Sequence, residues 1–125
     1  METIIVADDS KIIQNIVAKS FDNDDIQILK ANNGYEVIDL LKKNSNNVSG
    51  ILLDLNMPKY DGFMVLDFFK ANNLFDKIPI SIISGDDTKD TIDKAFEYQI
   101  TDMLNKPFTK DNVRNIVFKM INNKA

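Results

Sequence analysis

The sequence has 125 residues and a formal net charge of -4, which suits one domain around a single core and disfavours non-specific nucleic-acid binding. It contains no Cys and no His, which excludes disulfides, thiolate or imidazole metal ligands and a Ser-His-Asp triad. No apolar run approaches the ~20 residues that cross a bilayer, so we expect a cytoplasmic protein without membrane insertion, whose chemistry depends on carboxylates, amines, hydroxyls and backbone groups.

The first 31 residues contain two short apolar runs separated by a helical pattern. Residues 3–7 form a continuous run that ends in Asp8-Asp9, as a buried parallel strand does. Residues 26–31 predict a second strand. Between the strands, a helix with Ser10 as its N-cap is predicted to turn one apolar face inward. That face consists of Ile12, Ile13, Ile16, Val17 and Phe21.

The middle of the chain repeats this alternation. A second helix is expected after Asn33-Gly34. Its predicted inner face consists of Val37, Ile38 and Leu41. Residues 50–54 predict a third strand, which ends at Asp54, and a third helix is predicted over about 63–71.

The last third of the chain predicts two more strand–helix pairs. Residues 78–84 form the fourth predicted strand, in which Pro79 is tolerable only near the start. A weaker helix is predicted over about 89–98, and a short fifth strand ends at Asn105. The final helix has the clearest amphipathic pattern. Its apolar face consists of Val113, Ile116, Val117, Met120 and Ile121.

Five strand–helix pairs in alternation predict one α/β domain over residues 1–125. Such a pattern favours a doubly wound, five-stranded parallel sheet with helices on both faces. Connections between parallel strands are right-handed, and ligands of open α/β sheets bind outside the carboxyl ends of the strands. The residues that directly follow the strands are therefore the first candidates for function.

Charged and polar side chains stand at four of these strand ends: Asp8-Asp9, Asp54, Ser84 and Lys106. Two unit charges ~4 Å apart interact by about 4 kcal/mol at an effective dielectric of ~20, so three converging carboxylates call for a cation. A hard divalent ion prefers oxygen ligands, and Mg²⁺ is the abundant candidate. A single Asp in such a place is more often a turn or cap residue, so the hypothesis depends on the joint placement of the four sites.

These residues resemble the signature of the receiver domain of two-component response regulators, and the resemblance covers essentially the whole chain. The segments that carry it are Asp8-Asp9, Asp54, Met57-Pro58-Lys59-Tyr60-Asp61-Gly62, Ser84-Gly85 and Lys106-Pro107-Phe108. The resemblance implies a flavodoxin-like (βα)5 fold with the strand order 2-1-3-4-5. Among receivers, the chain looks like the single-domain, chemotaxis type.

The resemblance also implies a role for each signature residue. Asp54 is the implied phosphoryl acceptor, and Ser84 would donate a hydrogen bond to a phosphoryl oxygen. Lys106 would pair with Asp54 at rest and with the phosphoryl group afterwards, and the Lys106-Pro107 bond is expected to be cis. The implied Mg²⁺ ligands are Asp8 (largely through water), Asp9, Asp54 and the backbone carbonyl of Asn56.

The implied partners are proteins. Because the chain has no His, it cannot be its own phosphohistidine donor, and the resemblance implies a histidine kinase or a phosphotransfer protein in that role. The domain would catalyse only its own phosphorylation and dephosphorylation, and would otherwise not be an enzyme. With no output module after it, the chain is expected to signal to a protein target through the surface of its last two helices. Met103 stands where the family commonly has an aromatic residue, which puts the usual output route in question.

Three other functions are compatible with the same pattern. A degenerate receiver acting as a constitutive protein-binding module is disfavoured because no signature residue is missing. A flavin carrier would need a phosphate-binding loop after the first strand, where Asp8-Asp9 would repel phosphate. A phosphatase with an aspartyl nucleophile would need a general acid two residues after Asp54, and Asn56 cannot serve as one. Chemotaxis and a phosphorelay both suit the receiver.

Overall fold

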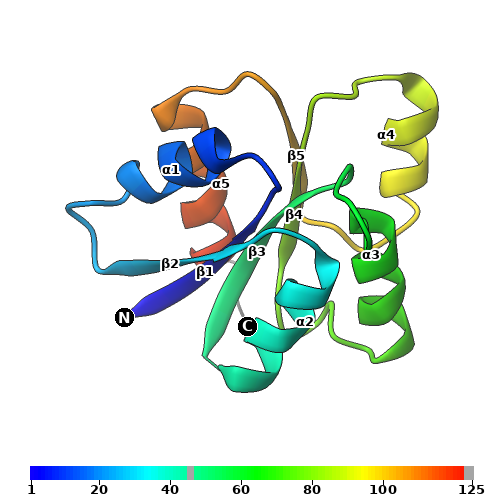
Figure 1. The fold of residues 1–125 in the computed structure, drawn as a ribbon, viewed down its shortest axis with the longest axis horizontal. Coiled ribbons are helices and arrows are strands. Elements are labelled where there is room, and N and C mark those ends of the chain that lie inside the picture. Colours follow the sequence, from blue (N-terminus) through cyan, green and yellow to red (C-terminus); the bar gives the residue numbers. More distant parts are fainter. Residues whose placement is uncertain (45–46, 123–125) are drawn as a thin grey trace.

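The computed structural model of this chain describes residues 1–44 and 47–122, and in this part strands and helices alternate strictly (Figure 1). The strands are β1 (Glu2–Ala7), β2 (Ile26–Ala31), β3 (Val48–Asp54), β4 (Ile80–Ser84) and β5 (Asp102–Asn105). The helices are α1 (Lys11–Lys19), α2 (Gly34–Lys43), α3 (Gly62–Ala71), α4 (Lys89–Ala95) and α5 (Lys110–Asn122). None of these described helices has both the length and the apolar character that a membrane crossing requires.

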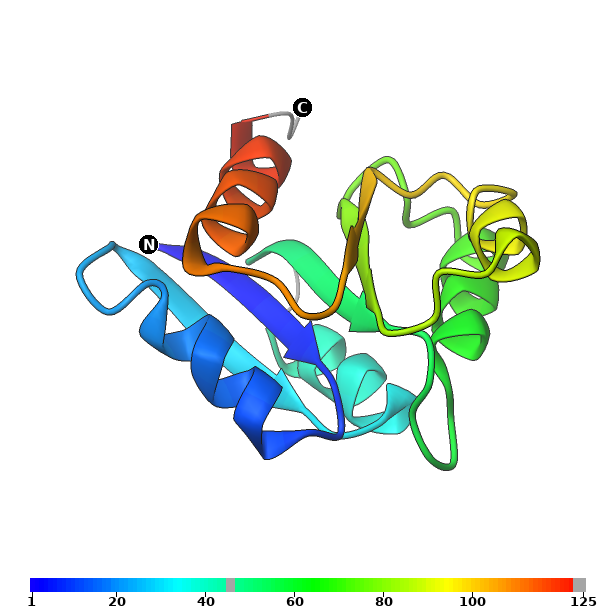
Figure 2. The ribbon, with the colours of Figure 1, turned by 90° about the horizontal axis from the view of Figure 1, so that it is seen from above.

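The five strands form one parallel sheet in the order β2-β1-β3-β4-β5. Figure 2 shows the arrows of β1 and β3 running in the same direction, so the loops that follow them emerge at one edge of the sheet. Helices α1 and α5 lie on one side of the sheet, and α2, α3 and α4 lie on the other (Figure 1). The predicted doubly wound, flavodoxin-like architecture is confirmed.

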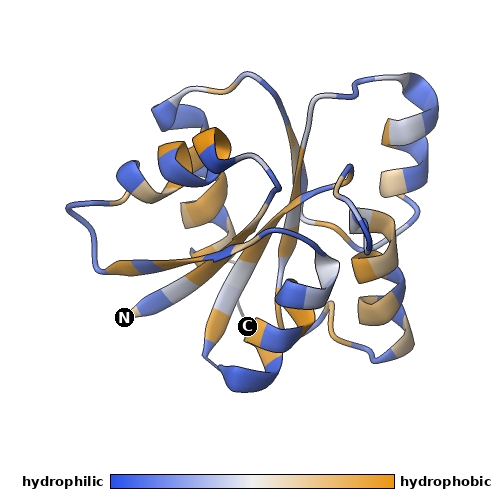
Figure 3. Cartoon of the chain, in the orientation of Figure 1, coloured by the Kyte–Doolittle hydropathy of each residue, from blue (hydrophilic) through white to orange (hydrophobic). Residues whose placement is uncertain are grey.

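The central strands are buried on both faces, which explains their uninterrupted apolar sequences. In β1, Ile4 and Val6 pack into the core beneath α1 and α5, whereas Ile5 and Ala7 pack into the core beneath α2, α3 and α4. Every residue of β3 and β4 is buried. Figure 3 shows this hydrophobic centre, with hydrophilic residues on the loops and outer helix surfaces. A rigid sheet therefore supports the residues at its carboxyl edge.

Several predicted element boundaries are wrong. Strand β1 begins at Glu2 rather than at residue 3, and β3 begins at Val48 rather than at residue 50. Strand β4 begins at Ile80 rather than at residue 78, because Pro79 has no N–H to donate to a neighbouring strand. The carbonyl of Pro79 still accepts a hydrogen bond from Ile51 N at 3.0 Å. Helix α4 ends at Ala95 rather than at residue 98. Ala95 is its one buried residue, so little packing supports a longer helix.

The predicted inner faces of the first two helices also need correction. Ile12 and Ile16 of α1 are 72% and 39% exposed, whereas Ile13, Val17 and Phe21 pack in the core as predicted. Gln14, which was not predicted, is also buried on this face. In α2, Leu40 rather than Ile38 joins Val37 and Leu41 at the core. Both sequences carry apolar residues around more than half of the helix, so periodicity alone does not decide how each helix is rotated about its axis.

Gly62, the first residue of α3, lies directly against the end of β3. A Cβ atom at this position would stand 2.4 Å from Asp54 O and 2.7 Å from Leu55 Cα, both backbone atoms that cannot rotate away. We expect Gly62→Ala to lower the free energy of unfolding by about 1–3 kcal/mol through overpacking, as measured by urea denaturation. Gly85→Ala is the matched control, because a Cβ there meets nothing within 4 Å. Equal losses in the two variants would contradict this prediction.

Candidate functional site

The predicted carboxylate cluster exists at the carboxyl edge of the sheet. Strands β1 and β3 are neighbours, with Ala7 opposite Leu53, so the acids that follow them emerge side by side. One carboxylate oxygen from each of Asp8, Asp9 and Asp54 lies within 4.8 Å of the others. Asp8 is fully buried and Asp54 is 3% exposed, whereas Asp9 is exposed. The cluster is therefore built into the sheet and open to solvent on one side.

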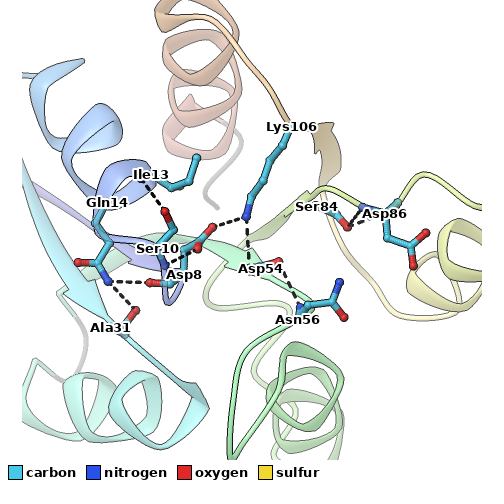
Figure 4. Close-up of polar contacts among 10 residues, drawn as sticks. All are labelled: Asp8, Ser10, Ile13, Gln14, Ala31, Asp54, Asn56, Ser84, Asp86 and Lys106. Carbon is cyan, nitrogen blue, oxygen red and sulfur yellow. Dashed lines mark hydrogen bonds and ion pairs between the residues drawn. The ribbon is translucent and has the colours of Figure 1, made fainter.

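Lys106 brings positive charge to this cluster from the loop after β5. Its Nζ lies 2.6 Å from Asp8 Oδ2 and 3.5 Å from Asp54 Oδ2, so the ammonium pairs with both acids and is nearer to Asp8 (Figure 4). Although burial opposes it, the hydrogen bonds and charges of the two acids raise the pKa of Lys106. Lys106 N also donates to Ser84 O at 2.8 Å, and the Lys106-Pro107 bond is cis as predicted.

The pKa of the Asp54 carboxyl group is raised above its ordinary value. Burial raises its pKa to about 6, and the neighbouring charge of Asp8 acts in the same direction. Two groups oppose this shift: the backbone N–H of Asn56, which donates to Asp54 Oδ1 at 3.2 Å, and the ammonium of Lys106. The ionised form of Asp54 is therefore destabilised in the folded protein unless further positive charge approaches it.

Ser84 stands at the end of β4, fully buried, and its hydroxyl faces Asp86. Ser84 Oγ accepts from Asp86 N at 3.0 Å and donates to Asp86 O at 3.2 Å. The Asp86 carboxylate points away from Asp54 (Figure 4). It accepts from Thr88 N at 3.0 Å and from Thr91 Oγ1 at 2.8 Å, and these bonds lower its pKa. Hydrogen bonds thus connect Ser84 to the first turn of α4.

The loop from Asn56 to Asp61 is shaped by local backbone interactions. Asp61 caps α3 by accepting from Met64 N at 3.0 Å, and Gly62 N donates to Leu55 O at 3.1 Å. Lys59 takes a left-handed backbone conformation with φ of 67°. Asn56 is exposed, and its N–H points to Asp54 as described above. These contacts hold the Asn56 backbone beside the carboxylate cluster.

The donor set suits a hard divalent ion. Carboxylates from two adjacent strands converge within 4.8 Å, and the exposed Asp9 leaves the cluster accessible from solvent. Oxygen ligands of this kind are what Mg²⁺ prefers, whereas an ion that favours imidazole or thiolate ligands would find neither in a chain without His or Cys. Asp8, Asp9 and Asp54 thus fit a magnesium site, as the sequence predicted.

Sequence reasoning missed Gln14, whose side chain lies directly behind Asp8. Its amide nitrogen donates to Asp8 O at 2.6 Å, and only 2% of the residue is exposed. The available signal was its position three residues before Val17 and seven before Phe21, which places a polar residue on the buried helix face. It also missed the carboxylate of Asp86 as a link to α4, for which the sequence offers only a generic capping signal before Thr88.

Comparison with known proteins agrees with the fold. The family model described as the response regulator receiver domain matches residues 4–118. A chemotaxis protein CheY homolog of Campylobacter jejuni is 28% identical over 109 residues, covering 85% of this chain and 82% of that protein. The Francisella response regulator 1452 receiver domain superposes with a TM-score of 0.85 at 28% identity, covering 98% of both chains.

Some relatives are much longer than this chain. The sensor histidine kinase CheAY of Helicobacter pylori is 27% identical over 118 residues, which cover 94% of this chain and 15% of that protein. The chain spans about a sixth of the length of this relative and of the two-component response regulator ARR2 of Arabidopsis thaliana. Because the family model covers nearly the whole sequence, and a carboxylate cluster with a lysine stands where the strands end, this chain belongs to the response regulator receiver domain family.

Proposed function

We propose that this receiver domain accepts a phosphoryl group on Asp54, in the cytoplasm, from a phosphohistidine of a histidine kinase or phosphotransfer protein. The observation that carries this proposal is the Asp54 carboxylate itself. It is 3% exposed, belongs to a three-acid cluster, and has the Lys106 ammonium at 3.5 Å. A buried acid with a pKa near 6 and a neighbouring cation is the kind of group that active sites use.

The transfer needs position and positive charge more than covalent assistance. A carboxylate oxygen of Asp54 attacks phosphorus, a new P–O bond forms, and the P–N bond to the donor imidazole breaks with its electron pair leaving on nitrogen. Lys106 stabilises the charge on the transferring phosphoryl oxygens. Asp8, Asp9, Asp54 and the backbone carbonyl of Asn56 would hold Mg²⁺, which would supply further positive charge to those oxygens.

Ser84 connects the modified site to the rest of the domain. To donate to a phosphoryl oxygen, the Ser84 hydroxyl must give up the hydrogen bond that it donates to Asp86 O, the bond that ties it to the Asp86 carbonyl. The Asp86 carboxylate in turn holds Thr88 and Thr91 at the start of α4. Phosphorylation would therefore shift the balance between two arrangements of the β4–α4 loop.

The surface of the last two helices, α4 and α5, is the proposed binding face for a protein target. Phe96, directly after α4, is 53% exposed and offers an apolar contact there. Met103 is half-buried and packs against the core on the same side of the sheet as α4. The flexible apolar side chain of Met103 can move into a space that opens beside it, but it has no hydroxyl with which to form a hydrogen bond there.

This coupling predicts which amide signals move when a phosphoryl mimic binds. With beryllofluoride and Mg²⁺, we expect amide shifts around Asp54 and also across residues 86–95. In Thr91→Val, which removes the bond to Asp86 and keeps the side-chain shape, the changes in α4 should fall to less than about half of their wild-type size, because a lost hydrogen bond uncouples the loop. Thr101→Val is the control and should respond like wild type. Changes confined to the surroundings of Asp54 in the wild type would contradict the coupling.

The test of the proposed function is incubation with acetyl phosphate, with and without Mg²⁺, followed by intact mass measurement. The wild type should gain one phosphoryl group when Mg²⁺ is present and essentially none when EDTA is added. No gain of mass with Mg²⁺ would contradict phosphoryl acceptance. Release of phosphate from many small phosphate esters per protein molecule would instead indicate a phosphatase.

A further inference from the structure

Gln14 is a buried polar residue on the sheet-facing side of α1. It is 2% exposed, and its neighbours on the same side include Ile13 and Val17, which belong to the hydrophobic core under α1 and α5. An amide buried without hydrogen bonds costs on the order of 1–3 kcal/mol. An unbranched apolar side chain of similar length would fill this space, so what Gln14 adds is its hydrogen bonding.

The Gln14 amide nitrogen binds the main chain at the ends of two strands. It donates to Asp8 O at 2.6 Å and lies 3.5 Å from Ala31 O (Figure 4). The Asp8 oxygen belongs to the peptide group that joins Asp8 to Asp9. Gln14 therefore holds the plane of the one peptide that connects two of the three carboxylates in the cluster.

Two further hydrogen bonds hold Asp8 in place. Asp8 N donates to Ala31 O at 3.0 Å, and Asp8 Oδ1 accepts from Ser10 N at 2.9 Å. The Asp8 carbonyl oxygen accepts its hydrogen bond from the Gln14 side chain. Without that bond, the Asp8-Asp9 peptide could rotate about its flanking bonds and move the Asp9 carboxylate relative to Asp54.

Gln14 is itself held by a second polar side chain. Its amide nitrogen donates to Asn32 Oδ1 at 2.8 Å, and Lys11 Nζ donates to the same oxygen at 2.8 Å. The backbone and side-chain amides of Asn32 both donate to Glu36 Oε1 at 3.0 Å. This chain of bonds runs from α2 through the end of β2 to α1, and it fixes the direction in which the Gln14 amide points.

We propose that Gln14 is a positioning residue for the divalent-ion site, because it orients the Asp8-Asp9 peptide so that both carboxylates converge with Asp54. This inference rests on the proposed function, since it assigns Gln14 to the site where Mg²⁺ would bind. Residues that orient metal ligands typically change metal affinity by 10–100-fold when they are replaced. Gln14 touches neither the ion nor the phosphoryl group, so its loss should weaken Mg²⁺ binding and spare the transfer at saturating Mg²⁺.

The direct test is calorimetric titration of the metal-free protein with MgCl₂ at neutral pH. Gln14→Met keeps the length and packing of the side chain and removes the amide, and its Kd for Mg²⁺ should rise by about 10-fold relative to wild type. Ser20→Ala is the matched control, because it removes one hydrogen bond from a buried residue at the other end of α1, where Ser20 Oγ donates to Ile16 O at 2.7 Å. Its Kd should equal that of the wild type.

A second measurement separates positioning from general damage to the fold. The Mg²⁺ concentration that gives half-maximal phosphorylation by acetyl phosphate should rise in Gln14→Met by the same factor as the Kd, while the maximal rate stays within about two-fold of wild type. Asn32→Ala removes one acceptor of the Gln14 amide, so its Kd for Mg²⁺ should rise less than that of Gln14→Met. This second variant tests the inference if Gln14→Met does not fold.

The outcomes distinguish this inference from the function on which it rests. If Gln14→Met and Asn32→Ala both have the same Kd for Mg²⁺ as the wild type, the assignment of Gln14 is overturned and the proposed function stays intact. An equal rise in Ser20→Ala would also overturn it, because a general loss of stability would then explain the effect. Absence of any Mg²⁺-dependent gain of phosphoryl mass by the folded wild type would overturn the proposed function itself.

Discussion

An Asp54→Asn variant is expected to gain no phosphoryl group from acetyl phosphate and Mg²⁺ under conditions in which the wild type gains one. The reason is chemical: the neutral amide lacks the carboxylate oxygen that attacks phosphorus, and an acyl phosphate cannot form on it. The change is nearly isosteric, and the protein should stay folded because Asn56 N can still donate to the remaining side-chain oxygen. Intact mass measures the effect directly as the loss of the added phosphoryl group.

The control for this experiment is an Asp→Asn change that leaves the cluster alone. Asp87, in the loop after β4, is exposed and lies outside the three-acid group. Asp87→Asn has the same charge change as Asp54→Asn and should gain mass like the wild type. A full mass gain in Asp54→Asn, with the modification mapped to another residue, would show that Asp54 is not the acceptor.

The free energy of unfolding of the metal-free protein is expected to decrease as pH rises from about 4 to above 6. The folded-state pKa of Asp54 is about 6, whereas the ordinary value that applies to the unfolded chain is 3.8. The folded protein therefore binds this proton more tightly than the unfolded chain does. The resulting stabilisation is complete below pH 3.8 and is lost as pH rises through 6. The difference between the two pKa values corresponds to ~3 kcal/mol.

Comparison with Asp54→Asn isolates this contribution from the other acids. The pKa of Asp24 is lowered by its bond to Arg114, and that of Asp86 by its bonds to Thr88 and Thr91. The stabilisation from these two acids is therefore present above pH 3.8 and is lost as pH falls below it, in the opposite direction to that from Asp54. Both proteins share these acids. Urea denaturation gives the change in the free energy of unfolding between pH 4.5 and pH 7 for each protein, and the difference between the two changes reports the contribution of Asp54. The variant should lack the decrease with rising pH, and parallel pH profiles would contradict the role of Asp54.

Addition of Mg²⁺ should reverse the loss of stability at pH 7. An ion that binds only the folded state stabilises it by ~2.7 kcal/mol at a concentration of 100 times its Kd. The bound cation would offset the repulsion among Asp8, Asp9 and Asp54 that burial makes costly. The same addition should stabilise Asp54→Asn less, because one charged ligand is gone.

Much of the site was predictable because parallel strands end at one edge of the sheet. The apolar run over residues 3–7 is followed by Asp8 and Asp9, and the run that begins at Gly50 ends in Asp54, so the convergence of the three acids follows from topology. The contacts of the site were less predictable. The approach of Lys106 to Asp8 at 2.6 Å depends on the path of the loop after β5, which no periodicity describes.

The amino-acid sequence by itself determined the fold class, the family and the identity of the acids, the hydroxyl and the amine at the strand ends, because these depend on the order of residues along each element. Only the tertiary structure decided how each helix is rotated against the sheet, which exposes Ile12 and buries Gln14. It also decided that the Asp86 carboxylate bonds to α4 rather than facing Asp54. The physical reason is that helix rotation and side-chain direction are set by packing among elements far apart in the chain, and local sequence carries no record of that packing.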